Sequence, residues 1–338
     1  MFGLLTAALI APPAPTQLAK LGSLEISIRS MVRAPQGNGV YLSVYDRVPG
    51  GKVGLKALGP DLQTGRDYAA WTEQPSGGKE GEDTGFALAA GKAVFTCGAF
   101  LQTQVKSTDL ASGKTAITVF DNVQHHFIGR PPLAMQGGRT LLVPGNSILQ
   151  PLDLQTMKYG ENMDLGQAFG SMLPLDDDTV LISTFDNADK NTFLIRKNLA
   201  TGETKYVRTP VSMCSMKADR GFIAAVAKAG IGTYRVYKVD PTSLALAPLT
   251  EPFKSTSTPA FAVRGGAKPL LALGDCGTVV FGLWSTRGYA GHGTRVLDLK
   301  SGRLYIANEL ATDMTVSADG STLYAKRSSL GVTSFRLP

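Results

Sequence analysis

The chain is poor in the side chains that form most metal and redox sites. Its 338 residues include three histidines and three cysteines, and the cysteines, Cys97, Cys214 and Cys276, lie far apart in the sequence. No C-x-x-C pair occurs, which excludes a zinc ribbon and a thioredoxin-type redox motif. We therefore interpret the cysteines as buried thiols, and we expect neither a metal site nor a cofactor.

The sequence also lacks the short motifs of common catalytic sites. It contains no G-x-S-x-G, no H-E-x-x-H and no P-loop. No two carboxylates stand out as the paired acids of a glycosidase. The two tryptophans, Trp71 and Trp284, are too few for a row of sugar-stacking rings. The motifs therefore name no catalytic residue.

Charge is scarce and evenly spread. Charged residues make up 18% of the chain and hydrophobic residues 43%, which indicates a folded protein with a buried core. Lysine and arginine exceed aspartate and glutamate by 34 to 27, a net charge of +7. Because no run of basic residues occurs, we expect no nucleic-acid partner, and the excess indicates a bias toward anionic partners.

No hydrophobic run is long enough to span a membrane. The ten apolar residues from Phe2 to Ala11 are too few for a transmembrane helix, and small residues and prolines follow them. The positive charges that usually begin a signal peptide are missing, since the first charge is Lys20. We expect residues 1–17 to be a signal peptide or a disordered leader. The protein would then be periplasmic or secreted.

Glycine is abundant, and it marks a repeated turn. The sequence Asp-Leu-x-Ser/Thr-Gly stands at 61–65, 109–113 and 298–302, with looser copies at 153–156, 198–202 and 240–243. Successive copies begin 48, 44, 45, 42 and 58 residues apart. An aspartate or asparagine that accepts backbone hydrogen bonds, followed by a glycine, is typical of a turn between two strands.

A second repeat precedes these turns. It consists of an apolar strand, a Gly/Asp turn and another apolar strand, at 31–44, 86–97, 133–143, 172–183, 213–226, 270–283 and 314–325. Asp176, Asp177 and Asp178 fall at the turn of the fourth copy, so we interpret them as a turn and not as a calcium site. Four short strands per repeat of about 45 residues, seven times over, predict an all-β, seven-bladed propeller with four-stranded antiparallel blades.

The last blade lacks its outer strand. Residues 313–337 supply three strands before the chain ends, whereas the segment SLEISIR at 23–29 alternates apolar Leu24, Ile26 and Ile28 with polar residues. This two-residue period is typical of a half-buried strand. We predict that it pairs with the C-terminal strand around Val332 to Phe335 and closes the ring. Residues 18–338 would then form one propeller domain.

The segment VSADGSTLYA at 316–325 resembles the repeat of YVTN-type propellers, Ser-Pro-Asp-Gly-x-x-Leu-Tyr-Val-Ala. That group includes surface-layer repeat proteins, the lactonase family and the propeller subunits of quinoprotein amine dehydrogenases. The resemblance covers the seventh blade, while the other six keep the spacing and the turns. It implies the propeller architecture, and it leaves the activity open.

Several long loops are expected on one face of the ring. In a propeller the crossings between blades and the loops between the second and third strands emerge together. Here the long ones are 71–85, 121–132, 253–269 and 285–293. Long loops carry function more often than short hairpins do. The candidate ligand-binding residues in them are His125, His126, Arg130, Arg264, Arg287, Tyr289 and His292. If they converge, histidine would act as an acid or base and arginine would hold a carboxylate, whereas the alternative is ordinary loop residues.

Three functions are compatible with this sequence. The one we favour is an exported, non-enzymatic propeller that presents its loop face to a protein or a glycan. The second is a lactonase-like hydrolase or a lyase acting on an acidic sugar, which requires the three histidines to meet at the channel mouth. The third is a propeller subunit of a multi-chain redox complex, which requires a large apolar surface patch.

Overall fold

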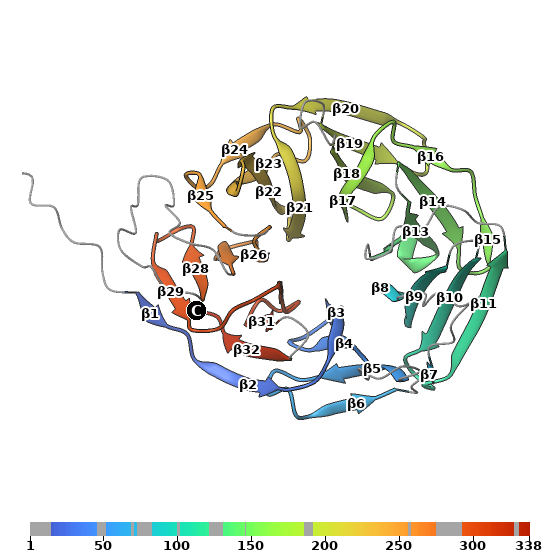
Figure 1. Ribbon diagram of the computed structural model, residues 1–338, viewed down its shortest axis with the longest axis horizontal. Helices are drawn as coiled ribbons and strands as arrows, with labels where there is room; N and C mark the ends of the chain where they lie inside the picture. The colour runs from blue at the N-terminus through green and yellow to red at the C-terminus, as the bar shows by residue number, and fades with distance from the viewer. Residues whose placement is uncertain are drawn as a thin grey trace, which may run out of the picture.

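The computed structural model describes residues 15–45, 52–68, 71–72, 83–99, 102–121, 131–145, 147–185, 192–255, 258–274, 293–327 and 331–338. Within them the chain forms seven β-sheets that stand around a central axis like the blades of a propeller (Figure 1). The predicted all-β, seven-bladed architecture is confirmed. In the described ranges, no helix has the length and hydropathy needed to cross a membrane.

Each blade is built from antiparallel strands that follow one another from the axis outward, here called strands A to D. Blades 1 to 3 contain β3 (Ile28–Arg33), β4 (Val40–Tyr45), β5 (Lys52–Leu58), β6 (Gly65–Asp67) and β7 (Trp71–Thr72); β8 (Asp83–Ala89), β9 (Lys92–Ala99), β10 (Gln102–Asp109) and β11 (Thr115–Asp121); and β12 (Leu133–Met135), the 3-10 turn η1 (Gln136–Gly138), β13 (Thr140–Pro144), β14 (Ile148–Asp153), β15 (Lys158–Tyr159) and β16 (Met163–Asp164).

The remaining blades follow the same plan. Blades 4 to 7 contain β17 (Ala168–Pro174), β18 (Thr179–Phe185), β19 (Thr192–Asn198) and β20 (Thr204–Thr209); β21 (Ser212–Asp219), β22 (Phe222–Gly230), β23 (Thr233–Val239), β24 (Leu246–Pro248) and β25 (Phe253–Lys254); β26 (Phe261–Arg264), β27 (Leu270–Leu273), β28 (Thr294–Asp298) and β29 (Leu304–Ala307); and β30 (Asp313–Val316), β31 (Thr322–Lys326) and β32 (Val332–Arg336). The N-terminal strands β1 (Thr16–Gln17) and β2 (Lys20–Leu24) join the last two of these blades.

The position of the A–B hairpin in blade 6 differs from the prediction. The sequence repeat placed it at 270–283, but the structure pairs β26 with β27, so the hairpin spans 261–273. Both segments read as an apolar run, a glycine and a second apolar run, and the repeat alone does not distinguish them. The crossing into blade 6 consequently ends before Phe261, and Arg264 lies at the end of a strand.

The Asp-Leu-x-Ser/Thr-Gly segments form the turns between strands C and D, as predicted. In blade 2 the Asp109 carboxylate accepts hydrogen bonds from the amides two and three residues ahead, at 3.1 and 2.7 Å. Gly113 follows with a φ of 76°, a left-handed conformation that glycine adopts without strain. In blade 4 the Asn198 side-chain oxygen accepts the equivalent bonds at 2.9 and 2.8 Å. The turn therefore needs a side-chain oxygen and not a charge.

These turns predict how stability depends on pH. Backbone amides that donate to the carboxylates hold the pKa values of Asp109 and Asp240 below the ordinary value of 3.8. A lowered native pKa adds stability above 3.8, and that stability is lost as the pH falls through the native value. We expect thermal melts followed by circular dichroism to fall below about pH 4. A variant with Asp109→Asn and Asp240→Asn should fall less, because an asparagine cap does not titrate. Parallel curves for the two proteins would contradict this account.

The hydrophobic core lies between the blades. Seven clusters of buried side chains form it, one at each junction of consecutive blades, including the junction of blade 7 with blade 1. Between blades 1 and 2, for example, Leu55 packs with Phe86 and Phe95, whose ring centroids lie 5.0 Å apart. Because each blade buries its faces against two neighbours, a missing strand in one blade weakens two junctions.

The N-terminus closes the ring, and the closing strand lies earlier than predicted. Strand β2 pairs antiparallel with β32, with Leu24 opposite Val332 and Lys20 opposite Phe335. The C-terminal partner is as predicted. Ile26 follows β2, however, and Ile28 begins β3 as the inner strand of blade 1. All three apolar residues pack in the cluster between blades 7 and 1, so the alternating pattern runs through the junction and does not show where one strand ends.

Blade 6 gains a fifth strand from the same N-terminal segment. Thr16 and Gln17 form β1, which pairs in parallel with β29 opposite Tyr305 and Ile306. Leu18 follows it, is buried among side chains of blades 6 and 7, and donates its amide to the Ile306 carbonyl at 2.8 Å. The segment thus fastens two blades together at the outside of the ring (Figure 1).

Candidate functional site

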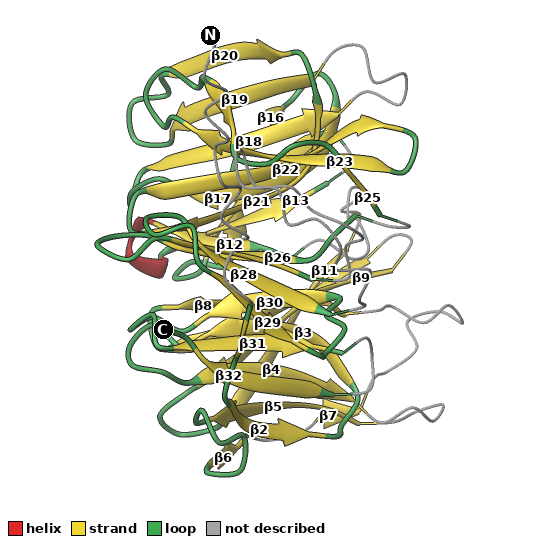
Figure 2. Cartoon of the chain, turned by 90° about the vertical axis from the view of Figure 1, so that its left-hand side faces the viewer, coloured by secondary structure: helices red, strands yellow, loops and turns green. Residues whose placement is uncertain are grey.

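The two rims of the ring are built differently. Strand A of every blade ends at an A–B turn, so the A–B and C–D turns share one rim, along which Figure 2 shows short connections. The blade crossings and B–C connections join strand ends at the opposite rim, called the loop rim below. The strand ends at this rim are separated by the longest stretches of sequence between described strands, for example from Thr72 to Asp83 and from Leu273 to Thr294.

One of the seven predicted ligand-binding residues lies in the described part of the chain. His125, His126, Arg130, Arg287, Tyr289 and His292 lie outside the described residues. Arg264 is 6% exposed at the A–B end of β26. Its guanidinium donates to the carbonyls of Lys268, Gly320 and Pro338 at 2.8, 2.9 and 3.0 Å. Arg264 therefore braces blade 6 against the end of blade 7 at the rim opposite the loops, while convergence of the other six residues stays a prediction.

A cavity of about 1070 Å³ follows the axis of the ring, and strand A of every blade contributes to its wall. Much of this wall is apolar, with Leu133, Ala134 and Met172 among its residues. Its charged side chains are Arg29, Arg33, Lys217, Asp219, Arg220 and Asp313. With four cations against two carboxylates, the described wall carries a surplus of two positive charges.

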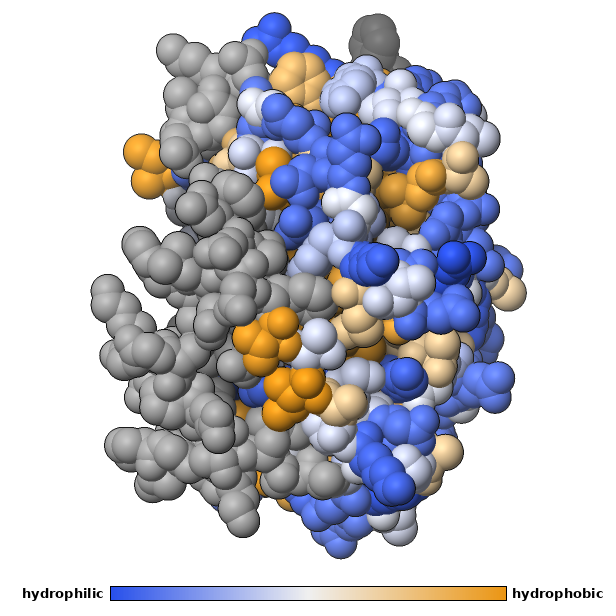
Figure 3. All heavy atoms as spheres, turned by 90° about the vertical axis from the view of Figure 1, so that its right-hand side faces the viewer, coloured by the Kyte–Doolittle hydropathy of each residue, from blue (hydrophilic) through white to orange (hydrophobic). Residues whose placement is uncertain are grey.

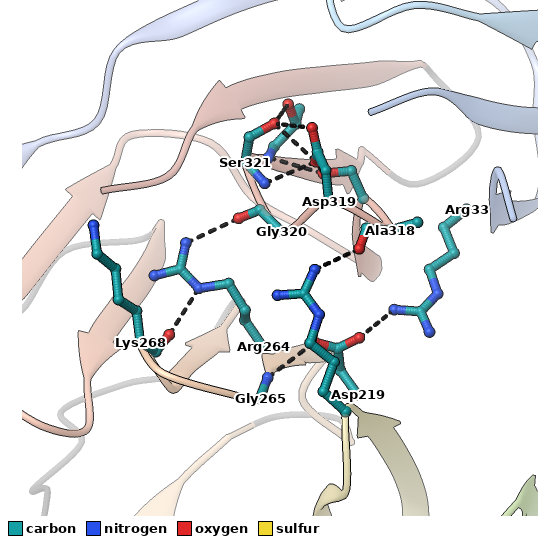
Figure 4. Close-up of polar contacts among 12 residues, drawn as sticks. Arg33, Asp219, Arg264, Gly265, Lys268, Ala318, Asp319, Gly320 and Ser321 are labelled. Atoms are coloured by element: carbon teal, nitrogen blue, oxygen red, sulfur yellow. Dashed lines mark hydrogen bonds and ion pairs between the residues drawn. The ribbon is translucent and has the colours of Figure 1, made fainter. Parts of the chain in front are cut away.

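Asp219 is the centre of a polar cluster at the A–B rim (Figure 4). It is 4% exposed, and one carboxylate oxygen accepts a hydrogen bond from Arg33 Nη1 at 2.7 Å. The other oxygen accepts the amide of Gly265 at 2.9 Å. Arg33 belongs to blade 1 and Asp219 to blade 5, which are not neighbours in the ring. The ion pair consequently crosses the mouth of the axial cavity.

Two arginines hold the Asp319–Gly320 turn of blade 7 in the same cluster. Arg220 Nη2 donates to the Ala318 carbonyl at 2.5 Å, and Arg264 donates to Gly320. The Asp319 carboxylate accepts the amide of Ser321 within the turn at 2.9 Å, and the turn is the one predicted from the sequence. Figure 4 shows these contacts joining blades 5, 6 and 7.

A second ion pair lies further along the cavity. Lys217 Nζ of blade 5 is 3.4 Å from a carboxylate oxygen of Asp313 in blade 7. Arg29, on the other side of blade 7, stacks over the Tyr45 ring at 4.8 Å. Both carboxylates of the described wall are therefore occupied by cations.

The described wall offers charged binding groups but little catalytic chemistry. None of its described residues is a histidine or a cysteine. Nor do the described ranges of the chain bring together three or more metal-ligating side chains of the His, Cys, Asp or Glu type. The Asp176 carboxylate instead accepts the amides of Asp178 and Thr179 at 2.9 and 2.6 Å, as the turn interpretation predicts. This arrangement can bind and orient a charged group.

Sequence reasoning missed the cluster around Asp219. Arg33 and Asp219 each end an inner strand, and the blade repeat places both at the A–B rim. The repeat does not say which rim residues meet across the axis, because that depends on side chains that reach across the axial cavity. The Arg33–Asp219 pair follows from the closed ring and not from the repeat.

Comparisons with solved structures show the fold. The chain superimposes on a Kuenenia stuttgartiensis hydrazine synthase with a TM-score of 0.62 and 14% identity, over 94% of this chain and 97% of that chain. It matches the RRP9 WD40 repeats with a TM-score of 0.62 and 11% identity, over 96% and 99% of the two chains. BamB from Moraxella catarrhalis matches with a TM-score of 0.51 and 16% identity, over 95% and 94%.

No protein-family model matches the chain, and no curated protein matches its sequence. At the identities found, the similar structures establish the propeller architecture and do not transfer a function. The YVTN subtype stays a prediction from the residues of blade 7.

Proposed function

We propose that the protein is an exported, non-enzymatic β-propeller that binds a partner protein through its loop rim. The support begins with the different roles of the two rims. At the A–B rim, Arg33, Arg220 and Arg264 are committed to holding blades together. The long connections belong to the other rim, and loops on a rigid scaffold are the usual place for recognition.

The observation that carries the proposal is the exposure of Ile231. This residue forms the B–C turn of blade 5, between Gly230 and Gly232, and its side chain is 95% exposed. Leu310, in the crossing from blade 6 to blade 7, belongs to the same rim and is 49% exposed. A partner that covered these two side chains would remove their apolar surface from water, which favours binding at this rim.

Export is the second part of the proposal, and the apolar run from Phe2 to Ala11 supports it. The similar structures include WD40 repeats and BamB, which fits an interaction role for the fold. The hydrolase and redox-subunit alternatives have no support from a described residue. The domain boundary at residue 18 also stays a proposal, and the first strand of the described residues is β1, from Thr16.

Partner binding and export are tested together in the producing cell. The protein takes an affinity tag after the exposed Pro338, and bound proteins are quantified after crosslinking and purification. We expect Ile231→Ser with Leu310→Ser to reduce the retained partner about tenfold, as the loss of two buried anchors would. Tyr206→Ser, which is 58% exposed on β20 away from this rim, is the matched control. Equal retention by all three proteins, or a cytoplasmic location, would refute the proposal.

A further inference from the structure

The outer strands of the blades differ in how they discourage pairing with other chains. An open strand edge is a template for another strand, and proteins usually blunt it with charge or proline. Most outer strands here follow that rule: β6 has Arg66 and Asp67, β15 Lys158, β16 Asp164, β20 Lys205 and Arg208, β24 Pro248, β25 Lys254 and β2 Lys20. Strands β1 and β7 have no charge either, but with two residues each they are too short to be a template. Among the longer outer strands, the exceptions are β29 and β11. Strand β29 has no charge, and β11 has none before its last residue, Asp121.

The chain itself covers one of the two exceptions. Strand β1 lies on the outer edge of β29, and the amide of Leu18 extends the pairing to Ile306. An uncharged outer edge in this protein is thus completed by an added strand. Strand β11 has no such added strand within the described residues, because it pairs there with β10 alone.

The free edge of β11 is long and regular. Seven residues pair with β10 without a register shift. Asp109 donates its amide to the Lys114 carbonyl at 2.9 Å. Along an antiparallel strand, residues that hydrogen-bond to the neighbouring strand alternate with residues whose backbone groups point away from it. Because Lys114 bonds to β10, Ala116 and Thr118 also direct their backbone groups toward β10. Ile117 and Val119 direct theirs outward.

The outer face of β11 is also apolar. The side chains of Ile117 and Val119 are 54% and 49% exposed. They are two residues apart and share one face of the strand. Figure 3 shows the side of the molecule where Figure 1 draws β11, with a few apolar side chains set in a largely hydrophilic surface.

We propose that β11 is a docking edge that binds an extended segment of a partner protein as a fifth strand of blade 2. The segment would have β-branched or aliphatic residues at alternate positions, facing Ile117 and Val119. It would have acidic residues at the end that lies beside Lys114. This surface is separate from the loop rim, so the inference goes beyond the function proposed above.

Charge complementarity supports the acidic end. Lys92, Lys114 and Arg66 are exposed near the first residue of β11. Arg66 reaches this turn from blade 1, where it donates to the carbonyls of Leu110 and Ala111 at 3.2 and 3.1 Å. The turn's own carboxylate, Asp109, is already occupied by backbone amides. A partner carboxylate would therefore meet a local excess of positive charge.

A second copy of this chain fits the edge less well. Two copies would meet through convex outer surfaces with a net charge of +7 each. A stable interface commonly buries about 20–30 residues on each side, whereas β11 offers two large apolar side chains. An added strand needs less area, because main-chain hydrogen bonds supply much of the affinity. The occupant is consequently a segment of a different protein.

The experiment uses synthetic peptides and the full chain. Two fluorescent peptides of about ten residues, the length of a long strand, alternate valine and threonine. One has two aspartates at its N-terminal end, and the other has them at its C-terminal end. A third peptide has prolines at alternate positions, which cannot donate to a strand ladder. We expect one aspartate-ended peptide to bind, the proline peptide not to bind, and hydrogen exchange at the amides of Ile117 and Val119 to slow on binding.

Variants decide whether β11 is the edge that binds. Ile117→Lys with Val119→Lys should weaken peptide binding about tenfold, a difference of about 1.4 kcal/mol. Tyr206→Lys on β20 is the matched control, and melting curves verify that each variant is folded. The Ile231 and Leu310 variant should bind the peptide normally, which separates this inference from the loop-rim function. The proposal is overturned if no strand peptide binds, if the double-lysine variant binds equally well, or if free protein forms a dimer that this variant abolishes.

Discussion

Deleting residues 1–24 is expected to lower the melting temperature by about 10 °C or to prevent folding. The deletion removes β1 and β2, and with them the outer strand of blade 7. Val332 and Phe335, which are 0% and 2% exposed, lose part of their cover. Exposing apolar side chains of this size costs about 1.5–3 kcal/mol each. The net stability of a whole domain is only about 5–15 kcal/mol.

The control for this experiment is a deletion that ends at residue 15, since it leaves β1 and β2 in place. Its melting temperature should match that of the full chain. Circular dichroism measures both proteins, and a point variant separates lost contacts from a changed chain length. If the protein without residues 1–24 melted like the protein without residues 1–15, β2 would not be the strand that closes the ring.

Gly22→Val serves as that point variant. A Cβ atom at Gly22 would overlap the Asp61 carbonyl oxygen and lie 2.6 Å from the carbonyl carbon of the same residue. Backbone atoms cannot move away as a flexible side chain could, so β2 would be pushed off β32. Overpacking of this kind costs about 1–3 kcal/mol or more. Ser23→Val, at the adjacent exposed position, should leave the melting temperature almost unchanged.

Replacing Asp219 by alanine should reduce the free energy of unfolding by about 2–4 kcal/mol. The substitution leaves the buried amide of Gly265 without its acceptor and Arg33 without its counter-ion. The full cost of breaking a buried ion pair does not apply, because the Arg33 side chain is 38% exposed and regains water. Urea denaturation measures the loss.

The matched control for Asp219→Ala is Asp67→Ala. Asp67 accepts a hydrogen bond from Lys56 at 2.6 Å, as short as the bond from Arg33 to Asp219, but its side chain is 69% exposed. An exposed pair contributes about 0–1 kcal/mol, so this variant should unfold at nearly the same urea concentration as the wild type. Equal losses for the two variants would show that burial at Asp219 contributes nothing.

The ring could be predicted from the sequence because its physical cause is local and repeated. Each C–D turn needs a side-chain oxygen at one position and, in most blades, a glycine four residues later, and both recur at an almost constant interval. The two-residue period near Leu24 likewise indicated the closing strand. It misplaced that strand by a few residues, since Ile26 and Ile28 are buried in the same cluster as part of the connection and of β3.

The polar contacts of the A–B rim could not be predicted, because they depend on the ring as a whole. Arg33 and Asp219 are 186 positions apart and come from blades that do not touch. The sequence repeat assigns Arg264 to a crossing and therefore predicts a ligand-binding residue. The structure instead places it at a strand end, where three backbone carbonyls occupy its guanidinium. The remaining candidates of that set stay predictions.

The pairing of β2 with β32 also orders events in time. The ribosome makes Lys20–Leu24 long before Val332–Arg336, because the other blades lie between them in the sequence. Until β32 has been made, β2 has no partner strand in blade 7. The other six blades can assemble before the seventh is complete. The nascent chain therefore stays an open arc until β32 has been made, a state in which a translocation channel or a chaperone still has access to it.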